Sequence, residues 1–192
     1  MDLTIIRDRI LNRSGSSMQP EEIDDEINFA QSTYIQPLAK LQTEAQYTTI
    51  ATDETVPLIS IATDIYEITS INDISTGFPL NVPLLKSKDS GATYGARKYG
   101  DNLFLQSITA GVVLNVAYDC KLKRLGAGVD EVTTPEIEER WHDLYYLGAL
   151  ALIIPEKYYP LFQDRLSAFS RERTRQTKWL GGSAKIKLRE VF

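Results

Sequence analysis

The spacing of hydrophobic and polar positions changes twice along the chain. Apolar residues recur at helical spacing between about residues 3 and 38, alternate in short runs from about 46 to 122, and return to helical spacing after about 135. Apolar residues three or four positions apart line one face of a helix, whereas alternate residues line one face of a strand. The pattern predicts an α+β protein in which helices from both chain ends form a bundle and a β-rich domain is inserted between them.

Residues 1–44 are predicted to form a helical hairpin. Leu3, Ile6 and Ile10 mark a first helix that ends near Gly15, and Pro20 opens a second one. The acidic residues just after Pro20 occupy the first turns of that helix, where negative charge is favourable against the helix dipole. Pro37 is expected to kink or end the second helix, because proline lacks the backbone N–H of a helix interior.

Residues 45–130 are predicted to form the inserted, sandwich-like β domain. Candidate strands are 46–51, 65–72, 81–86, 102–107 and 111–122, with glycine- and proline-containing turns between them. The last strand alternates most clearly, and Cys120 falls on its apolar face, which predicts a buried thiol. The segment at 86–100, KSKDSGATYGARKYG, is interpreted as a long exposed loop of the kind that carries binding residues.

Residues 131–180 are predicted to complete the bundle with two helices. The first is expected to begin at Pro135, because proline is favoured at the first helical position. It carries, at helical spacing, Ile137, Trp141, Leu144, Tyr145, Gly148 and Leu152. The second, from Pro155 or Pro160, is expected to bury Leu161, Phe162, Leu166 and Phe169.

The final helix runs into a segment without hydrophobic residues, SRERTRQTK at 170–178. A helix that is polar on every side has no core to lie against, so this segment is predicted to project roughly 13 Å beyond the bundle. Gly181 and Gly182 are interpreted as a hinge, and residues 181–192 as an extended arm. Within the arm, apolar and basic residues alternate as in a strand: Lys185, Ile186, Lys187, Leu188, Arg189 and Phe192.

Charge is distributed unevenly. The formal net charge is −5, with −8 in residues 1–70, −2 in residues 71–154 and +5 in residues 155–192. An acidic start and a basic end can attract neighbouring copies head to tail or direct the basic end to an acidic partner. A merely solvated polar surface is the alternative.

Groups that could carry catalysis are few. His142 is the only histidine and Cys120 the only cysteine, and no local spacing supplies further metal ligands. A single cysteine excludes an internal disulfide and fits a reducing compartment. The glycine-rich segment lacks the spacing of a phosphate-binding loop, and the apolar run at 147–154 is too short to span a bilayer. The sequence therefore predicts neither an enzyme nor a cofactor or metal site.

The basic run Arg171, Arg173, Arg175 and Lys178 permits two functional interpretations. Such a run contacts either nucleic-acid phosphates or an acidic protein surface. Glu172 within the run and the acidic balance of the whole chain favour the protein contact.

Taken in order, the segments of the chain resemble the head–tail adaptor (connector) proteins of tailed bacteriophages. The resemblance covers most of the chain and depends on order and spacing, with Pro160 as a departure. The segments that carry it are PEEIDDEINFAQSTYI, YTTIAT, DIYEITSIND, a hairpin with YGDNLFLQ, VVLNVAYDCKL and, most specifically, TTPEIEERWHDLYYLGALALI.

This resemblance implies a structural virion protein. It implies a ring, typically of twelve copies, that binds the portal protein on one side and a tail or nozzle protein on the other. Genomic DNA would pass through the lumen without sequence readout. The expected location is the head–tail interface of the virion, and the host cytoplasm during assembly, with no membrane contact.

Two surfaces are assigned on this basis. The portal or neighbour interface is expected at Arg171, Arg173, Arg175, Lys178, Trp179, Leu180, Lys185, Ile186, Lys187, Leu188, Arg189 and Phe192, with the hinge at Gly181 and Gly182. The tail-facing loop is expected to use Lys86, Lys88, Tyr94, Arg97, Lys98 and Tyr99. The alternative is a DNA-binding module that uses the basic last helix.

Overall fold

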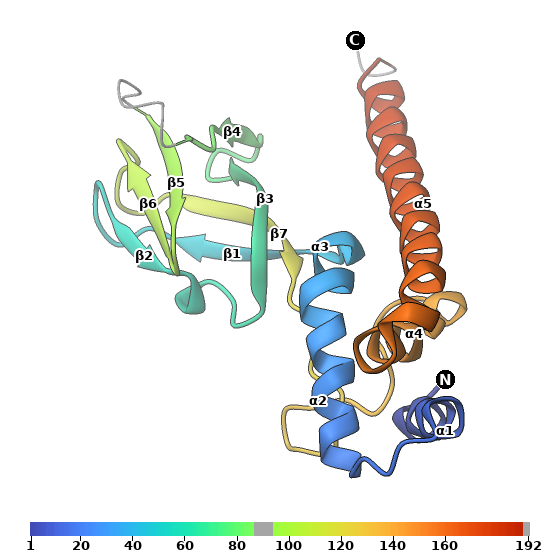
Figure 1. Cartoon of the computed structure of the whole chain (residues 1–192). Coiled ribbons are helices and arrows are strands. Elements are labelled where there is room, and N and C mark those ends of the chain that lie inside the picture. Colours follow the sequence, from blue (N-terminus) through green and yellow to red (C-terminus); the bar gives the residue numbers. More distant parts are fainter. Residues whose placement is uncertain (87–93, 190–192) are drawn as a thin grey trace. The chain divides into compact units, whose positions relative to one another are not determined.

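The chain is a mixed α+β protein that divides into two compact units (Figure 1). The computed structural model describes residues 1–86 and 94–189, with the side chains of the last helix as far as Arg175. The helical unit comprises Met1–Lys40 and Leu122–Phe192, and the β unit is Leu41–Lys121. The β unit thus begins four residues before the insert predicted at 45–130 and ends nine residues before that insert does.

The N-terminal helices begin and end where the sequence predicts. Helix α1 (Leu3–Ser14) is capped by the Asp2 carboxylate, which accepts a hydrogen bond from the backbone N–H of Ile5. It ends at Gly15, whose φ of 64° is the left-handed conformation that glycine adopts easily. Helix α2 (Pro20–Ala30) opens with a capping box between Gln19 and Glu22.

Pro37 does not end the second helix at once. A π-helical turn at Gln31–Ile35 follows α2, and helix α3 (Gln36–Ala39) continues beyond it. The wider turn accommodates a proline whose N–H is missing from the helical ladder. The helix stops at Lys40, which has a left-handed φ of 45°.

Pro135 does not begin a helix, contrary to the prediction. A 3₁₀ turn at Glu139–Trp141 precedes helix α4 (Asp143–Ile153). Two contacts hold the preceding segment extended: the Thr133 carbonyl accepts from the N–H of Leu3, and the Glu136 carboxylate accepts from the N–H of Lys123. These tertiary hydrogen bonds outweigh the local preference for a helix at 135.

The core of the helical unit is centred on α4, which is buried on nearly every side from Leu144 to Ala151. Helix α5 packs on it through Phe162 and Phe169, both fully buried. The Phe162 ring meets Tyr34 edge-on at 5.4 Å between ring centroids. Leu161 is 53% exposed, contrary to the prediction, because it lies on the side of α5 away from this contact.

Helix α5 (Pro155–Arg189) is one unbroken helix that contains Pro160. The predicted hinge at Gly181 and Gly182 is therefore wrong, and residues 183–189 are helical rather than extended. A strand without a neighbour leaves its backbone N–H and C=O groups unpaired, whereas a helix pairs them within the segment. Residues 190–192, with Phe192, lie outside the described residues.

The β unit contains two antiparallel sheets. The order of the first is β1-β7-β3-β4 and that of the second is β2-β6-β5. The first contains β1 (Gln42–Thr48), β7 (Val113–Cys120), β3 (Ile65–Asp73) and β4 (Leu80–Val82). The second contains β2 (Thr55–Pro57), β6 (Asn102–Gln106) and β5 (Gly95–Tyr99).

Both sheets contribute to one hydrophobic cluster, with Ile71, Leu114 and Val116 from the first and Val56, Leu103 and Leu105 from the second. Leu114, Val116 and Tyr118 are buried as the alternation of β7 predicts, whereas Cys120 is only half-buried. Strand β5 lies inside the segment predicted to be a loop, and β2 is not among the predicted strands.

Candidate functional site

The first candidate surface is the distal segment of α5, which we define as residues 170–189. Phe169 is fully buried, and the described side chains that follow it, residues 170–175, are all polar or charged. At 1.5 Å per residue, the helix continues for about 30 Å beyond its last buried side chain. The first residues of this segment still touch the helical unit, because Glu172 pairs with Arg140 and Arg173 pairs with Glu138.

The basic residues at the base of this segment have different environments. Arg171 and Arg175 are exposed. The Arg173 side chain is only 15% exposed, lies 5.3 Å from the centre of the Phe169 ring, and pairs with Glu138 at 3.6 Å. Arg173 thus stabilises the helical unit, and Arg171 and Arg175 are the described cations of this run that a partner can reach.

The remaining residues of the predicted interface lie on the distal helix without described side chains. They are Lys178, Trp179, Leu180, Lys185, Ile186, Lys187, Leu188 and Arg189.

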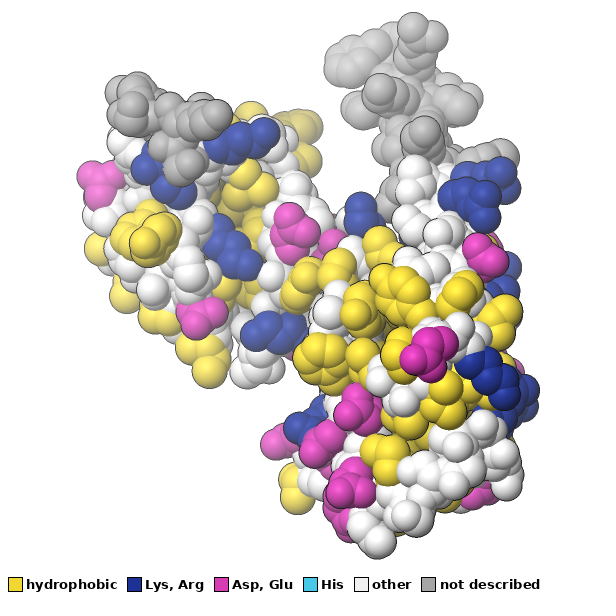
Figure 2. All heavy atoms as spheres, in the orientation of Figure 1, with side chains coloured by type: hydrophobic (Ala, Val, Ile, Leu, Met, Phe, Trp, Pro, Cys, Tyr) yellow, Lys and Arg dark blue, Asp and Glu magenta, His cyan; other side chains and the backbone are white. Residues whose placement is uncertain are grey.

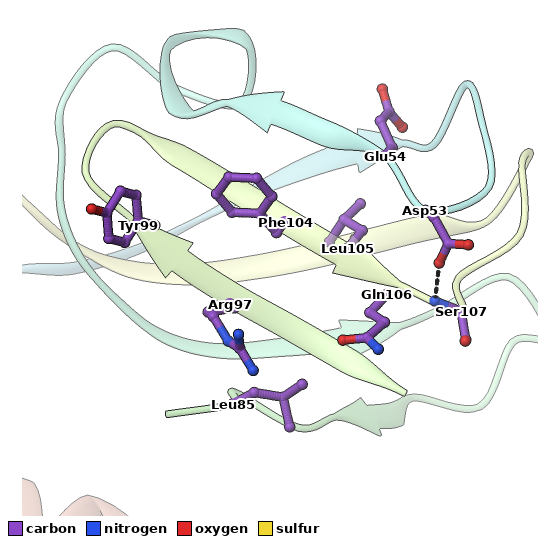
Figure 3. Close-up of a pocket in the computed structure, with 9 residues that line it drawn as sticks. All are labelled: Asp53, Glu54, Leu85, Arg97, Tyr99, Phe104, Leu105, Gln106 and Ser107. Atoms are coloured by element: carbon purple, nitrogen blue, oxygen red, sulfur yellow. Dashed lines mark hydrogen bonds between the residues drawn. The ribbon is translucent and has the colours of Figure 1, made fainter. Parts of the chain in front are cut away.

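The second candidate surface is an open groove of about 630 Å³ in the β unit, shown in Figure 3. Arg97 on β5 and Phe104 on β6 face each other across the strand pair, and Tyr99 lies beside them. Phe104 is 40% exposed and Tyr99 is 76% exposed. The groove therefore presents aromatic surface next to a guanidinium group.

The carboxylates at the end of the groove are already used in turns. The Asp53 carboxylate accepts from the N–H of Ser107 at 2.6 Å. Glu54 accepts from the Tyr47 hydroxyl at 2.5 Å and from the N–H of Ile50 at 3.0 Å. These contacts fix the turns before β2 and after β6.

The structure brings together only part of the predicted tail-facing loop. Arg97 and Tyr99 line the groove, whereas Lys98 donates to the backbone carbonyl of Tyr66 at 2.9 Å. Tyr94 is 40% exposed and does not line the groove. Lys86 ends the described part of this segment, and Lys88 lies outside the described residues.

Sequence analysis missed Phe104 and Gln106, which also line the groove. Their signal is the alternation in β6, where Leu103 and Leu105 point into the core and Phe104 and Gln106 point outward.

Two side chains of types that often take part in catalysis, His142 and Tyr145, are buried in the helical unit. His142 is buried, and its Nε2 lies 2.8 Å from the carbonyl oxygen of Ile137. Burial raises the pKa of the Tyr145 hydroxyl far above its usual range. Within residues 1–86 and 94–189, no three His, Cys, Asp or Glu side chains are grouped as metal ligands. None of the helices that the structure describes has the length and apolar character needed to cross a bilayer.

Comparisons with protein-family models and with curated proteins find no match for this chain.

Proposed function

We propose that this chain is a structural head–tail adaptor of a tailed bacteriophage. Copies form a ring, expected to contain twelve, between the portal protein and a tail or nozzle protein, and genomic DNA passes through the lumen. In each copy, helices from both chain ends form the bundle, the sandwich-like β unit is inserted into it, and distal α5 is the extended arm. The protein acts at the head–tail interface of the virion and has no catalytic role.

The observation that carries this proposal is the length of α5 beyond its own core. An isolated helical segment of this length is marginal in water, and most helices gain their stability by packing one face against other elements. The distal segment has no described buried side chain after Phe169. A packing surface on another polypeptide would supply the missing stabilisation, as a portal or a neighbouring copy does in a ring.

The groove in the β unit supports a second contact. Tyr99 and Phe104 are large exposed aromatics next to Arg97, and aromatic and arginine side chains are enriched at protein interfaces. We assign the groove to the tail-facing side of the adaptor.

The test is binding of the full chain to its cognate portal ring, measured by co-sedimentation. The full chain should co-sediment with the ring, and a variant that ends at Arg175 should not. Arg171→Glu with Arg175→Glu should weaken binding, and the effect should shrink as salt is raised, because exposed charges are screened.

The matched control is Lys121→Glu with Lys123→Glu, which changes the charge equally at exposed residues outside α5. It should bind like the full chain. If the variant ending at Arg175 binds the ring as well as the full chain does, the role of the distal segment is wrong. If the full chain does not bind the ring at all, the adaptor proposal is wrong.

DNA binding through α5 is the second candidate, and the exposure of Arg171 and Arg175 one helical turn apart favours it. It requires duplex DNA to bind at low salt, with an affinity that falls steeply as salt rises. Absence of binding at low salt would remove this candidate.

A further inference from the structure

The outward face of α2 carries an exposed aromatic residue beside a shallow groove. Ile23, Ile27 and Ala30 of this helix are fully buried, whereas Phe29 is 53% exposed. The groove has a volume of about 330 Å³, and Phe29 lines it together with Asp25, Leu122 and Arg124. A large exposed aromatic at a groove is the kind of feature that a partner's apolar side chain covers.

The helix that carries Phe29 is acidic. Helix α2 contains five acids and no base. Asp24 pairs with Arg7 of α1 and Asp25 pairs with Arg124 at 2.5 Å, while Glu21 and Glu22 are exposed and Glu26 is half-buried. Figure 2 shows the acidic side chains gathered over α2. The partner of this face should therefore combine positive charge with apolar residues.

The distal segment of α5 has this composition. Residues 170–189 contain seven bases and one acid, and Trp179 and Leu180 lie among the bases. Figure 2 shows basic side chains along the described part of the segment. The two surfaces thus match in both charge and apolar character.

The distal segment cannot reach α2 of its own chain. Helix α5 is unbroken from Pro155 to Arg189, its last buried side chain is Phe169, and its last described contact with the rest of the helical unit is the Arg173–Glu138 pair. The segment therefore leads away from the helical unit by about 30 Å, and turning it back would require breaking the helix. The complementary surface must come from a second copy.

We propose that the distal segment of α5 in one copy docks on the α2 face of a second copy, with Phe29 at the centre of the contact. This inference rests on the proposed adaptor function and names the neighbouring copy as the partner of the distal segment. Because the two surfaces differ, the contact is head-to-tail and can repeat around a closed ring.

A charge-swap experiment on the full chain tests the contact. Asp25→Lys with Glu26→Lys reverses the charge of the α2 face beyond its first turn. Arg175→Glu with Lys178→Glu reverses the charge of two residues in the distal segment. Sedimentation velocity at low salt, over a range of protein concentrations, should show self-association of the full chain. Each double variant should weaken it about tenfold or more, and the combined variant should restore most of the loss.

Phe29→Ser should also weaken self-association, and this loss should persist at high salt because it removes an apolar contact rather than a charge. Arg9→Glu with Lys157→Glu is the matched control here, because both residues are exposed and neither lines the groove or belongs to residues 170–189, and it should associate like the full chain. Circular dichroism checks that each variant is folded. A variant that does not fold is replaced by Phe29→Ala or by neutral Asp25→Asn with Glu26→Gln, which should weaken association to a smaller extent.

The inference is wrong if the full chain stays monomeric at every concentration. It is also wrong if the combined variant loses as much self-association as the two double variants lose together. Failure of this inference can be distinguished from failure of the adaptor proposal. Portal binding without this contact overturns the inference alone, whereas self-association without portal binding overturns the adaptor function alone.

Discussion

Two tyrosines in the β unit donate hydrogen bonds to carboxylates, and each pair joins segments that are apart in the sequence. The Tyr47 hydroxyl donates to Glu54 at 2.5 Å, and the Tyr118 hydroxyl donates to Asp64 at 3.0 Å. Burial, together with these carboxylates, raises the pKa of Tyr47 and of Tyr118 to about 12. Both hydroxyls therefore stay protonated in the folded protein at pH values where a free tyrosine ionises.

This shift predicts that the β unit loses stability in alkali. A tyrosine in the unfolded chain has a pKa of about 10, so between about pH 10 and 12 the unfolded state releases protons that the folded state keeps. The free energy of unfolding should be unaffected by these groups below about pH 10 and should fall as the pH rises toward 12. Urea unfolding at a series of pH values measures the fall.

Tyr47→Phe and Tyr118→Phe should each make that fall shallower. Tyr99→Phe is the matched control because the Tyr99 side chain is exposed. A pH dependence that is the same in the Tyr47→Phe variant and the parent would contradict the role of the Tyr47–Glu54 pair.

At the scale of elements, helices α2, α4 and α5 approach one another closely at Gly148 of α4. A Cβ atom at this position would lie 2.8 Å from the Cβ of Ala30 in α2 and 3.3 Å from the Phe162 ring in α5. Glycine is thus required here by close packing, although it weakens a helix by about 1 kcal/mol relative to alanine.

Gly148→Ala should therefore destabilise the protein, by about 1–3 kcal/mol, because the overpacking exceeds the gain in helix propensity. Chemical denaturation measures the change. The double variant Ala30→Gly with Gly148→Ala removes the clashing methyl group and should be more stable than the sum of the single effects predicts. If Gly148→Ala alone were stabilising, the close approach of α2 and α4 would be wrong.

The elements that could be predicted from the sequence are those whose signals are local. Helices α1 and α2 have caps, a terminal glycine or an opening proline, and β3 and β7 have clear alternation. Strand β2 spans only Thr55–Pro57, and β5 contains Gly95, Ala96, Arg97 and Lys98, so neither has an alternating apolar pattern. Their pairing with β6 defines them, and pairing between distant segments is not visible locally.

The same limit explains the errors near the C-terminus and the partial prediction of the groove. Alternation at 185–192 indicated a strand, but the helix continues to Arg189. Arg97 and Tyr99 could be predicted as binding residues because they lie in a polar, glycine-rich segment. Phe104 could not, because its exposure depends on which face of β6 the second sheet covers.

At the scale of the whole molecule, the two ends of the β unit are adjacent. The backbone N–H of Cys120 donates to the carbonyl of Leu41 at 2.8 Å, and β1 pairs with β7 along its length. The β unit has its own hydrophobic cluster and is one continuous segment of chain. These are the properties of a domain that folds independently.

We expect residues 41–121 to fold when expressed alone. Cooperative urea unfolding and a near-ultraviolet circular dichroism signal would show it. The complementary chain, in which a short glycine-rich link joins Lys40 to Leu122, should keep the helical unit. A fragment of residues 41–121 that unfolds without a cooperative transition would contradict the independence of the β unit.

An unbroken α5 also has a rotational consequence. One residue inserted between Ser170 and Arg175 would lengthen the rod by about 1.5 Å and turn everything beyond it by about 100°. Seven inserted residues would add about 10 Å but change the azimuth by only about 20°. Insertions of seven residues between Ser170 and Arg175 should therefore be tolerated. Insertions of a single residue there should be as damaging as the loss of the docking contact made by the distal segment.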